Sequence, residues 1–143
     1  MIPLKSYTVV NRCISGINAG IQAAHSQSEL VMKAVKQNLP DDQLLTILEW
    51  SKTPTMVILN GGGSFKMRQF LKRVTAGEPL QRFPFATFYE PDMENMLSAI
   101  TMIVPDSQIA CEIKLDGTMP GLDGYSVIEQ DILMDLSRMR LAI

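Results

Sequence analysis

The chain has 143 residues, of which 46% are hydrophobic and 20% are charged. This length suits one compact domain with its own core and is short for two domains. No apolar run reaches the roughly 20 residues of a membrane span, and no secretory signal precedes the first strand, so we expect a cytoplasmic protein. The formal net charge of −2 argues against a general nucleic-acid binder, although a local basic patch is compatible with it.

The first predicted elements are a strand and a helix joined by a glycine turn. Residues 7–10 are β-formers, whereas small and apolar residues recur at helical spacing after them. The recurring stripe consists of Ile17, Ile21, Ala24, Ser28, Val31 and Val35. The N–H groups at the start of this helix then lie beside the end of the strand, where α/β proteins keep their sites.

The next segments predict a second helix, a second strand and a third helix. Pro40 and the two aspartates after it are typical of a helix start, and this helix ends near Trp50. Residues 55–59 form an apolar run between a proline and three glycines, which is typical of a strand covered on both faces. Ser64 is the expected N-cap of a helix that continues to Val74.

Two more strands are predicted at residues 83–89 and 97–104, joined by a short acidic turn. Strands separated by helices favour parallel crossovers, whereas a short loop joins an antiparallel pair. The sequence therefore predicts an α/β fold: a three-layer single domain whose mixed four-stranded sheet carries helices on both faces. A C-terminal extension ending in a helix completes the expected fold.

We take residues 1–105 as the core and residues 106–143 as the extension. Residues 106–115 can add an edge strand to the sheet. Ser126 and Glu129 fit a capping box that opens the final helix. This helix can pack on the same domain or on a second subunit, and its pattern does not choose between them.

The two cysteines, Cys13 and Cys111, have neither metal-site spacing nor a disulfide framework around them. Free cysteines of this kind are usually buried, and we expect both thiols to lie in the interior.

A polar groove is predicted at the first helix. Asn18, Gln22 and His25 lie three to four residues apart and share one helix face. If Glu90 or Asp92 of the acidic turn faces them, a carboxylate would orient a water or the imidazole for attack on an ester. The alternatives are a core histidine bonded to a backbone carbonyl and a solvated acidic turn.

Other residues complete the expected site. Asn60 and helix N–H groups would receive the oxyanion, and Thr101 would position the substrate. Residues 61–63 are three glycines before a helix, which can cradle a phosphate or simply form a permissive turn. Lys66 and Arg73 belong to the best candidate surface for a tRNA backbone. The full basic group is Lys66, Arg68, Lys72, Arg73 and Arg82.

The order of these motifs resembles the type 2 peptidyl-tRNA hydrolase family over about residues 5–105. Residues 12–26 resemble its signature, in which a strand ends in arginine before a Ser-Pro-Gly or Gly-Lys turn and Ala-Ala-Gln-x-x-His-Ala. Residues 88–101 resemble the Glu-Pro-Asp…Leu-Thr-Ala-Ile-Ala version of its last hairpin. Trp50 precedes a strand as in that family, and residues 56–60 match the end of its second strand.

The resemblance implies hydrolysis of the ester between a peptide and the terminal ribose of tRNA, with no metal or cofactor, by a protein that is often a homodimer. Asn18 and Asn60 stand where the family has lysines, and an amide donates a hydrogen bond but carries no charge. The alternative is a catalytically inactive binding module of the same fold that holds a nucleotide, an RNA end or a protein partner. A third possibility is an interaction protein, whose binding surface the C-terminal extension would form.

Overall fold

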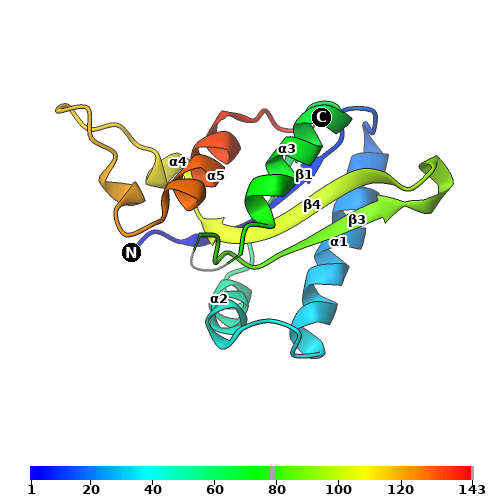
Figure 1. Cartoon of the computed structure of the whole chain (residues 1–143), viewed down its shortest axis with the longest axis horizontal. Coiled ribbons are helices and arrows are strands. Elements are labelled where there is room, and N and C mark those ends of the chain that lie inside the picture. Colours follow the sequence, from blue (N-terminus) through cyan, green and yellow to red (C-terminus); the bar gives the residue numbers. More distant parts are fainter. Residues whose placement is uncertain (78–79, 143) are drawn as a thin grey trace.

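The computed structural model describes residues 1–77 and 80–142 and contains one four-stranded mixed sheet (Figure 1). The strands are β1 (Leu4–Val10), β2 (Met56–Asn60), β3 (Phe85–Glu90) and β4 (Met96–Pro105). Their order in the sheet is β2-β1-β4-β3. β2 runs parallel to β1, and β4 runs antiparallel to both of its neighbours, as the element order predicted.

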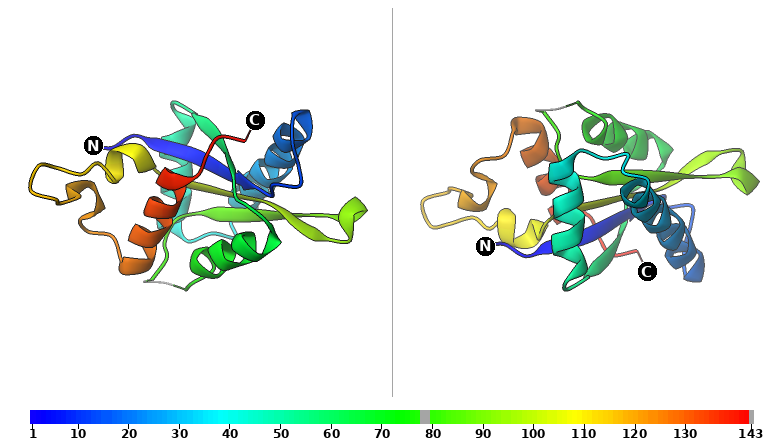
Figure 2. Two further views of the ribbon diagram at one scale, coloured as in Figure 1. Left: turned by 90° about the horizontal axis from the view of Figure 1, so that it is seen from above. Right: turned by 90° about the horizontal axis from the view of Figure 1, so that it is seen from below.

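The described helices cover both faces of this sheet, which confirms the predicted fold class (Figure 1). They are α1 (Ile17–Val35), α2 (Asp41–Ser51), α3 (Ser64–Val74), α4 (Ser107–Ala110) and α5 (Val127–Arg138), with 3-10 turns η1 (Pro91–Met93) and η2 (Pro120–Leu122). Helices α1 and α2 lie on one face, and α3 and α5 lie on the other. The segment between α4 and α5 projects from the body of the molecule (Figure 2). Within the two described ranges, no helix has both the length and the apolar character of a membrane span.

Helix α1 packs on the sheet through small and polar residues and not through the apolar stripe that predicted it. Ala19, Ala23 and Leu30 are buried, and the hydroxyl of Ser26 hydrogen-bonds that of Thr101 at 2.5 Å. The stripe faces away from the sheet, and its six residues are exposed: Ile17, Ile21, Ala24, Ser28, Val31 and Val35. Small inward residues let the helix approach the strands closely, which leaves its larger apolar residues on the outside.

Residues 106–115 do not form the expected edge strand. Asp106 instead caps α4, and its carboxylate accepts hydrogen bonds from the N–H groups of Gln108 and Ile109 at 3.0 and 3.4 Å. The same carboxylate pairs with Lys5 of β1 at 2.7 Å. An aspartate directly after a strand can start a helix by satisfying its first N–H groups, and here this local preference ends the strand.

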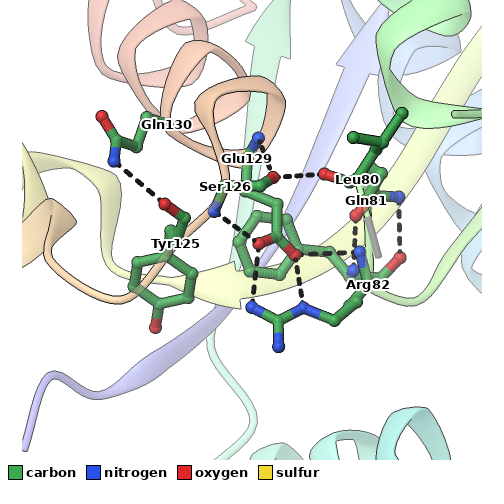
Figure 3. A network of polar contacts seen from close by, with 8 residues as sticks. Leu80, Gln81, Arg82, Tyr125, Ser126, Glu129 and Gln130 are labelled. Carbon is green, nitrogen blue, oxygen red and sulfur yellow. Dashed lines mark hydrogen bonds and ion pairs between the residues drawn. The ribbon is translucent and has the colours of Figure 1, made fainter. Parts of the chain in front are cut away.

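A buried carboxylate fixes α5 to the core. Glu129 is 1% exposed, and it accepts hydrogen bonds from the Arg82 guanidinium at 3.0 Å and from the N–H groups of Arg82 and Ser126 at 2.9 and 3.0 Å (Figure 3). The predicted capping box between Ser126 and Glu129 is confirmed. Burial acts to raise the pKa of Glu129, but the hydrogen bonds from Arg82 and Ser126 outweigh it and hold the pKa below its ordinary value. Helix α5 of the extension therefore packs on the same sheet as the core.

The turn after β2 is closely packed. Its last residue, Gly63, is the N-cap of α3 in place of the expected Ser64, whose hydroxyl accepts a hydrogen bond from the Asn11 amide at 3.1 Å. A Cβ atom at Gly61 would lie 2.3 Å from both the Met67 sulfur and a Val9 methyl group. Glycine is therefore required at position 61 by packing against α3 and β1.

We predict that Gly61→Ala lowers the free energy of unfolding by about 1–3 kcal/mol, because the added methyl group forces the core to shift. The matched control is Gly20→Ala, since nothing lies within 4 Å of a Cβ at that helical position. Alanine there is expected to raise stability by about 0.5–1 kcal/mol. Urea unfolding of both variants measures the difference, and equal stability of the two would contradict the packing assigned to Gly61.

We predict that Glu129→Gln lowers the free energy of unfolding at pH 7 by about 2 kcal/mol, because charge-assisted hydrogen bonds to a buried carboxylate are lost. The folded-state pKa of Glu129 lies below the ordinary 4.5. The contribution of the Glu129 carboxylate to the free energy of unfolding is therefore fully present above pH 4.5. It is lost as the pH falls through the pKa of Glu129 in the folded state. The difference in free energy of unfolding between wild type and variant should therefore become smaller below about pH 4.5. The exposed Glu112→Gln is the control in urea titrations across pH, and a pH-independent gap would argue against this role.

Candidate functional site

The first helix and the acidic turn lie in direct contact. The Gln22 amide donates a hydrogen bond of 2.6 Å to one carboxylate oxygen of Glu90, and the Asp92 N–H donates one of 3.2 Å to the other. The hydrogen bond from Gln22, followed by that from Asp92, lowers the pKa of Glu90, and the nearby His25 acts in the same direction. Glu90 is therefore a carboxylate at neutral pH, held in place at both oxygens.

A serine that sequence reasoning missed belongs to the same network. The Ser98 hydroxyl donates a hydrogen bond of 2.6 Å to the Gln22 carbonyl oxygen. The pairing of β3 with β4 shifts register between Phe88 and Tyr89, so Ser98 is the extra residue of a β-bulge. Strict alternation would have turned Ser98 to the face opposite Thr101. The available signal was the Leu-Thr-Ala-Ile-Ala motif, in which Ser98 stands at the threonine position.

Thr101 and His25, also predicted for this groove, differ in their exposure to solvent. Thr101 is completely buried under α1, where its hydroxyl contacts those of Thr8 at 2.7 Å and Ser26 at 2.5 Å. The expectation that Thr101 positions the substrate is therefore wrong, because no substrate can reach it in this fold. His25 is exposed, and its ring centroid lies 4.5 Å from that of Phe88. The alternative of a core histidine does not apply.

Asn18 and Asp92 both lie at the surface. Asn18 is exposed in the first turn of α1, which starts after Gly16 at a positive φ of 61°. Asp92 is exposed in η1, and the turn closes through Glu94 and Asn95 at φ values of 56° and 57°. These non-glycine residues in the left-handed region hold the hairpin end in an unusual conformation.

Three predicted site residues, Asn60, Lys66 and Arg73, line a different cavity. This cavity has a volume of about 500 Å³ and lies on the α3–α5 face, with Arg138 and Arg140 in its wall. The expectation that Asn60 joins the groove of α1 is therefore wrong, because Asn60 lines this cavity together with Lys66 and Arg73 of the predicted basic surface. A sequence pattern that places residues near one end of a sheet does not say on which face each side chain lies.

The cysteines are more exposed than expected. Cys13 is exposed, so the prediction of a buried thiol there is wrong. Cys111 is half-buried, and this burial raises the pKa of its thiol. Within residues 1–77 and 80–142, no three His, Cys, Asp or Glu side chains are grouped in a way that could hold a metal ion.

Comparisons with protein-family models, with curated proteins and with solved structures give no match for this chain. The fold and the contacts define an α/β protein with two polar surfaces. We name the first the acidic-hairpin site; its residues are Gln22, His25, Glu90 and Ser98. We name the second the basic pocket; its polar residues are Asn60, Lys66, Gln69, Arg73, Asp135, Arg138 and Arg140.

Proposed function

We propose that this protein is a peptidyl-tRNA hydrolase-like esterase that cleaves the ester between a peptide or aminoacyl group and tRNA. The observation that carries the proposal is the 2.6 Å hydrogen bond between Gln22 and Glu90. It joins the two motifs on which the resemblance to that family depends, although they are 68 residues apart in the chain. A tRNA substrate also agrees with the cytoplasmic location expected from the sequence.

The acidic-hairpin site supplies groups that suit ester hydrolysis. The Glu90 carboxylate would accept a hydrogen bond from a water molecule and orient its oxygen toward the ester carbonyl. As the new C–O bond forms, the water proton passes to a carboxylate of the hairpin or to His25 and then to the ribose oxygen, which leaves as the old C–O bond breaks. The Asn18 amide and the first N–H groups of α1 are donors for the developing oxyanion.

Gln22 and Ser98 would act as positioning residues. Ser98 holds the carbonyl end of the Gln22 amide at 2.6 Å, which directs the amide NH₂ toward Glu90. An amide whose two ends are both bonded keeps one orientation, and the carboxylate it contacts is preorganised in turn. Asp92 is the second candidate base, because it lies exposed on the same turn.

The competing proposal is a catalytically inactive binding module of the same fold. Two observations favour it: Asn18 and Asn60 carry no charge where the family has lysines, and Thr101 is buried. Such a module would still hold an RNA end, a nucleotide or a protein partner, so the two proposals differ in turnover and not in binding.

We also propose a homodimer formed through the outer face of α1. The stripe from Ile17 to Val35 is exposed and alternates spacings of four and three residues, the heptad spacing of helix-to-helix seams. Its six members carry no charge, so two copies would not repel each other. Contact between two copies would bury apolar surface that the fold leaves open.

We predict that Glu90→Gln lowers the rate of hydrolysis of an N-blocked aminoacyl-tRNA at least 100-fold, which lies within the range of general-base catalysis. Glutamine keeps the size of the side chain and removes the charge. Release of free tRNA by the purified protein measures the rate. The matched control is Glu112→Gln, an exposed residue that lies outside both polar surfaces and the groove beside α3, which should keep the wild-type rate.

If the Glu90 variant and Asp92→Asn both keep full activity, the site assignment is wrong even if the protein is an esterase. If the wild-type protein at high concentration releases no more tRNA than a heat-treated sample, the esterase proposal fails. Binding of tRNA without release would then support the inactive module.

For the homodimer, we predict that Val31→Glu gives a monomer in size-exclusion chromatography with light scattering, because a charge at the centre of the seam must be desolvated. Val31 is exposed, so the variant should fold normally. The control Leu115→Glu adds the same charge at an exposed apolar residue of the projecting segment and should leave the dimer intact. A wild-type protein that is monomeric at high micromolar concentration would rule the dimer out.

A further inference from the structure

The basic pocket concentrates positive charge in a protein whose net charge is −2. Four cationic side chains line its cavity of about 500 Å³, and one carboxylate, Asp135, lies among them. Arg73 pairs with Asp135 at 2.6 Å. Among the described residues, Lys66 and Arg140 form no ion pair. The pocket therefore holds positive charge that the fold does not neutralise.

The C-terminal tail completes this pocket by backbone contacts. The Asn60 N–H donates to the Arg140 carbonyl at 2.8 Å, and the Ala142 N–H donates to the Ile58 carbonyl at 3.0 Å. These bonds run the tail along the free edge of β2. Because they are made by the main chain, they hold position 140 in place whatever its side chain is, and they give no structural reason for an arginine there.

The N-terminal end of α3 adds to the positive potential. Its N-cap is Gly63, no side chain caps it, and no acidic residue lies in its first turn. Lys66 lies in that turn, where the helix dipole disfavours a cation. The Lys66 stem lies against Gly62, where a Cβ would be 2.9 Å from the lysine Cδ, and a Cβ at Gly63 would be in ordinary contact with the Arg12 guanidinium at 3.4 Å. A bound anion would relieve this unfavourable grouping of charges.

We propose that the basic pocket binds a phosphate group of RNA and holds the tRNA backbone while the ester is cleaved at the acidic-hairpin site. The identity of the RNA rests on the proposed function, whereas the phosphate chemistry rests on the pocket itself. Lysine and arginine side chains around one cavity are the groups that bind phosphate oxygens.

A second groove favours an extended strand over a free phosphate. It has a volume of about 540 Å³ and lies on the other flank of α3. Arg68, Lys72 and Tyr89 line it, together with one carboxylate, Glu94. Tyr89 is 46% exposed, so its ring is accessible for stacking with a base. Cations on both flanks of α3 suit several successive phosphates of one strand, whereas a free phosphate would need only the pocket.

The test measures binding of fluorescently labelled, deacylated tRNA by anisotropy at several salt concentrations. The double variant Lys66→Ala/Arg140→Ala should weaken binding about tenfold or more and make the slope of log K against log salt about two less steep, since two phosphate contacts are lost. The matched control is Lys36→Ala/Lys52→Ala, which removes two exposed cations from the α1–α2 side. Thermal unfolding checks that both proteins fold.

Unchanged tRNA binding by the Lys66/Arg140 variant would overturn the pocket assignment. Competition by inorganic phosphate or AMP as effective as that by unlabelled tRNA would show a small-molecule site and overturn the RNA assignment. If the wild type hydrolyses the substrate and the Lys66/Arg140 variant binds tRNA as tightly as the wild type does, only the pocket proposal is refuted. If the variant loses tRNA binding but the wild type shows no hydrolysis, only the esterase proposal is refuted.

Discussion

The pairing of β4 on both of its edges is the constraint on which the rest of the structure depends. β4 lies between β1 and β3 in the sheet, and nine of its ten residues are buried. Because β4 pairs with β1 on one edge and with β3 on the other, it brings the acidic hairpin at the end of β3 under the start of α1. The contact between Gln22 and Glu90 follows from that arrangement. Without the central strand, the two motifs would have no common surface.

The polar groups beneath α1 are buried at a cost that their mutual hydrogen bonds offset. Gln22, Ser98 and Thr101 lie in the layer between helix and sheet, where an unpaired polar atom would be expensive. Each has a hydrogen-bonding partner across that layer. The bulge at Ser98 makes this possible, since it turns a hydroxyl from the other face toward Gln22. The network therefore fixes the register of the helix on the sheet and the orientation of Glu90 together.

Local patterns predicted the elements well because each has a local cause: the apolar run before three glycines for β2, and the capping box at Ser126 for α5. The faces of the elements could not be predicted in the same way. Helix α1 packs on the strands through the residues that are small enough to approach them. Its apolar stripe would have predicted the opposite helix face as the buried one. Because of the bulge, alternation along β4 does not predict that Ser98 faces α1 as Thr101 does, and Ser98 was missed. Asp106 shows a cap overriding an expected strand.

The division of charge between the two faces has a physical rationale if the substrate is tRNA. A carboxylate close to the ester repels the phosphates of the same molecule, and the overall negative charge of the chain adds to this repulsion. A separate cluster of cations can supply the attraction without neutralising Glu90. The last residues of the chain would then take part in function, because Arg138 and Arg140 lie in the wall of that cluster. On this view the extension beyond the core strengthens substrate binding on one face while the carboxylate on the other face stays ionised and available for chemistry.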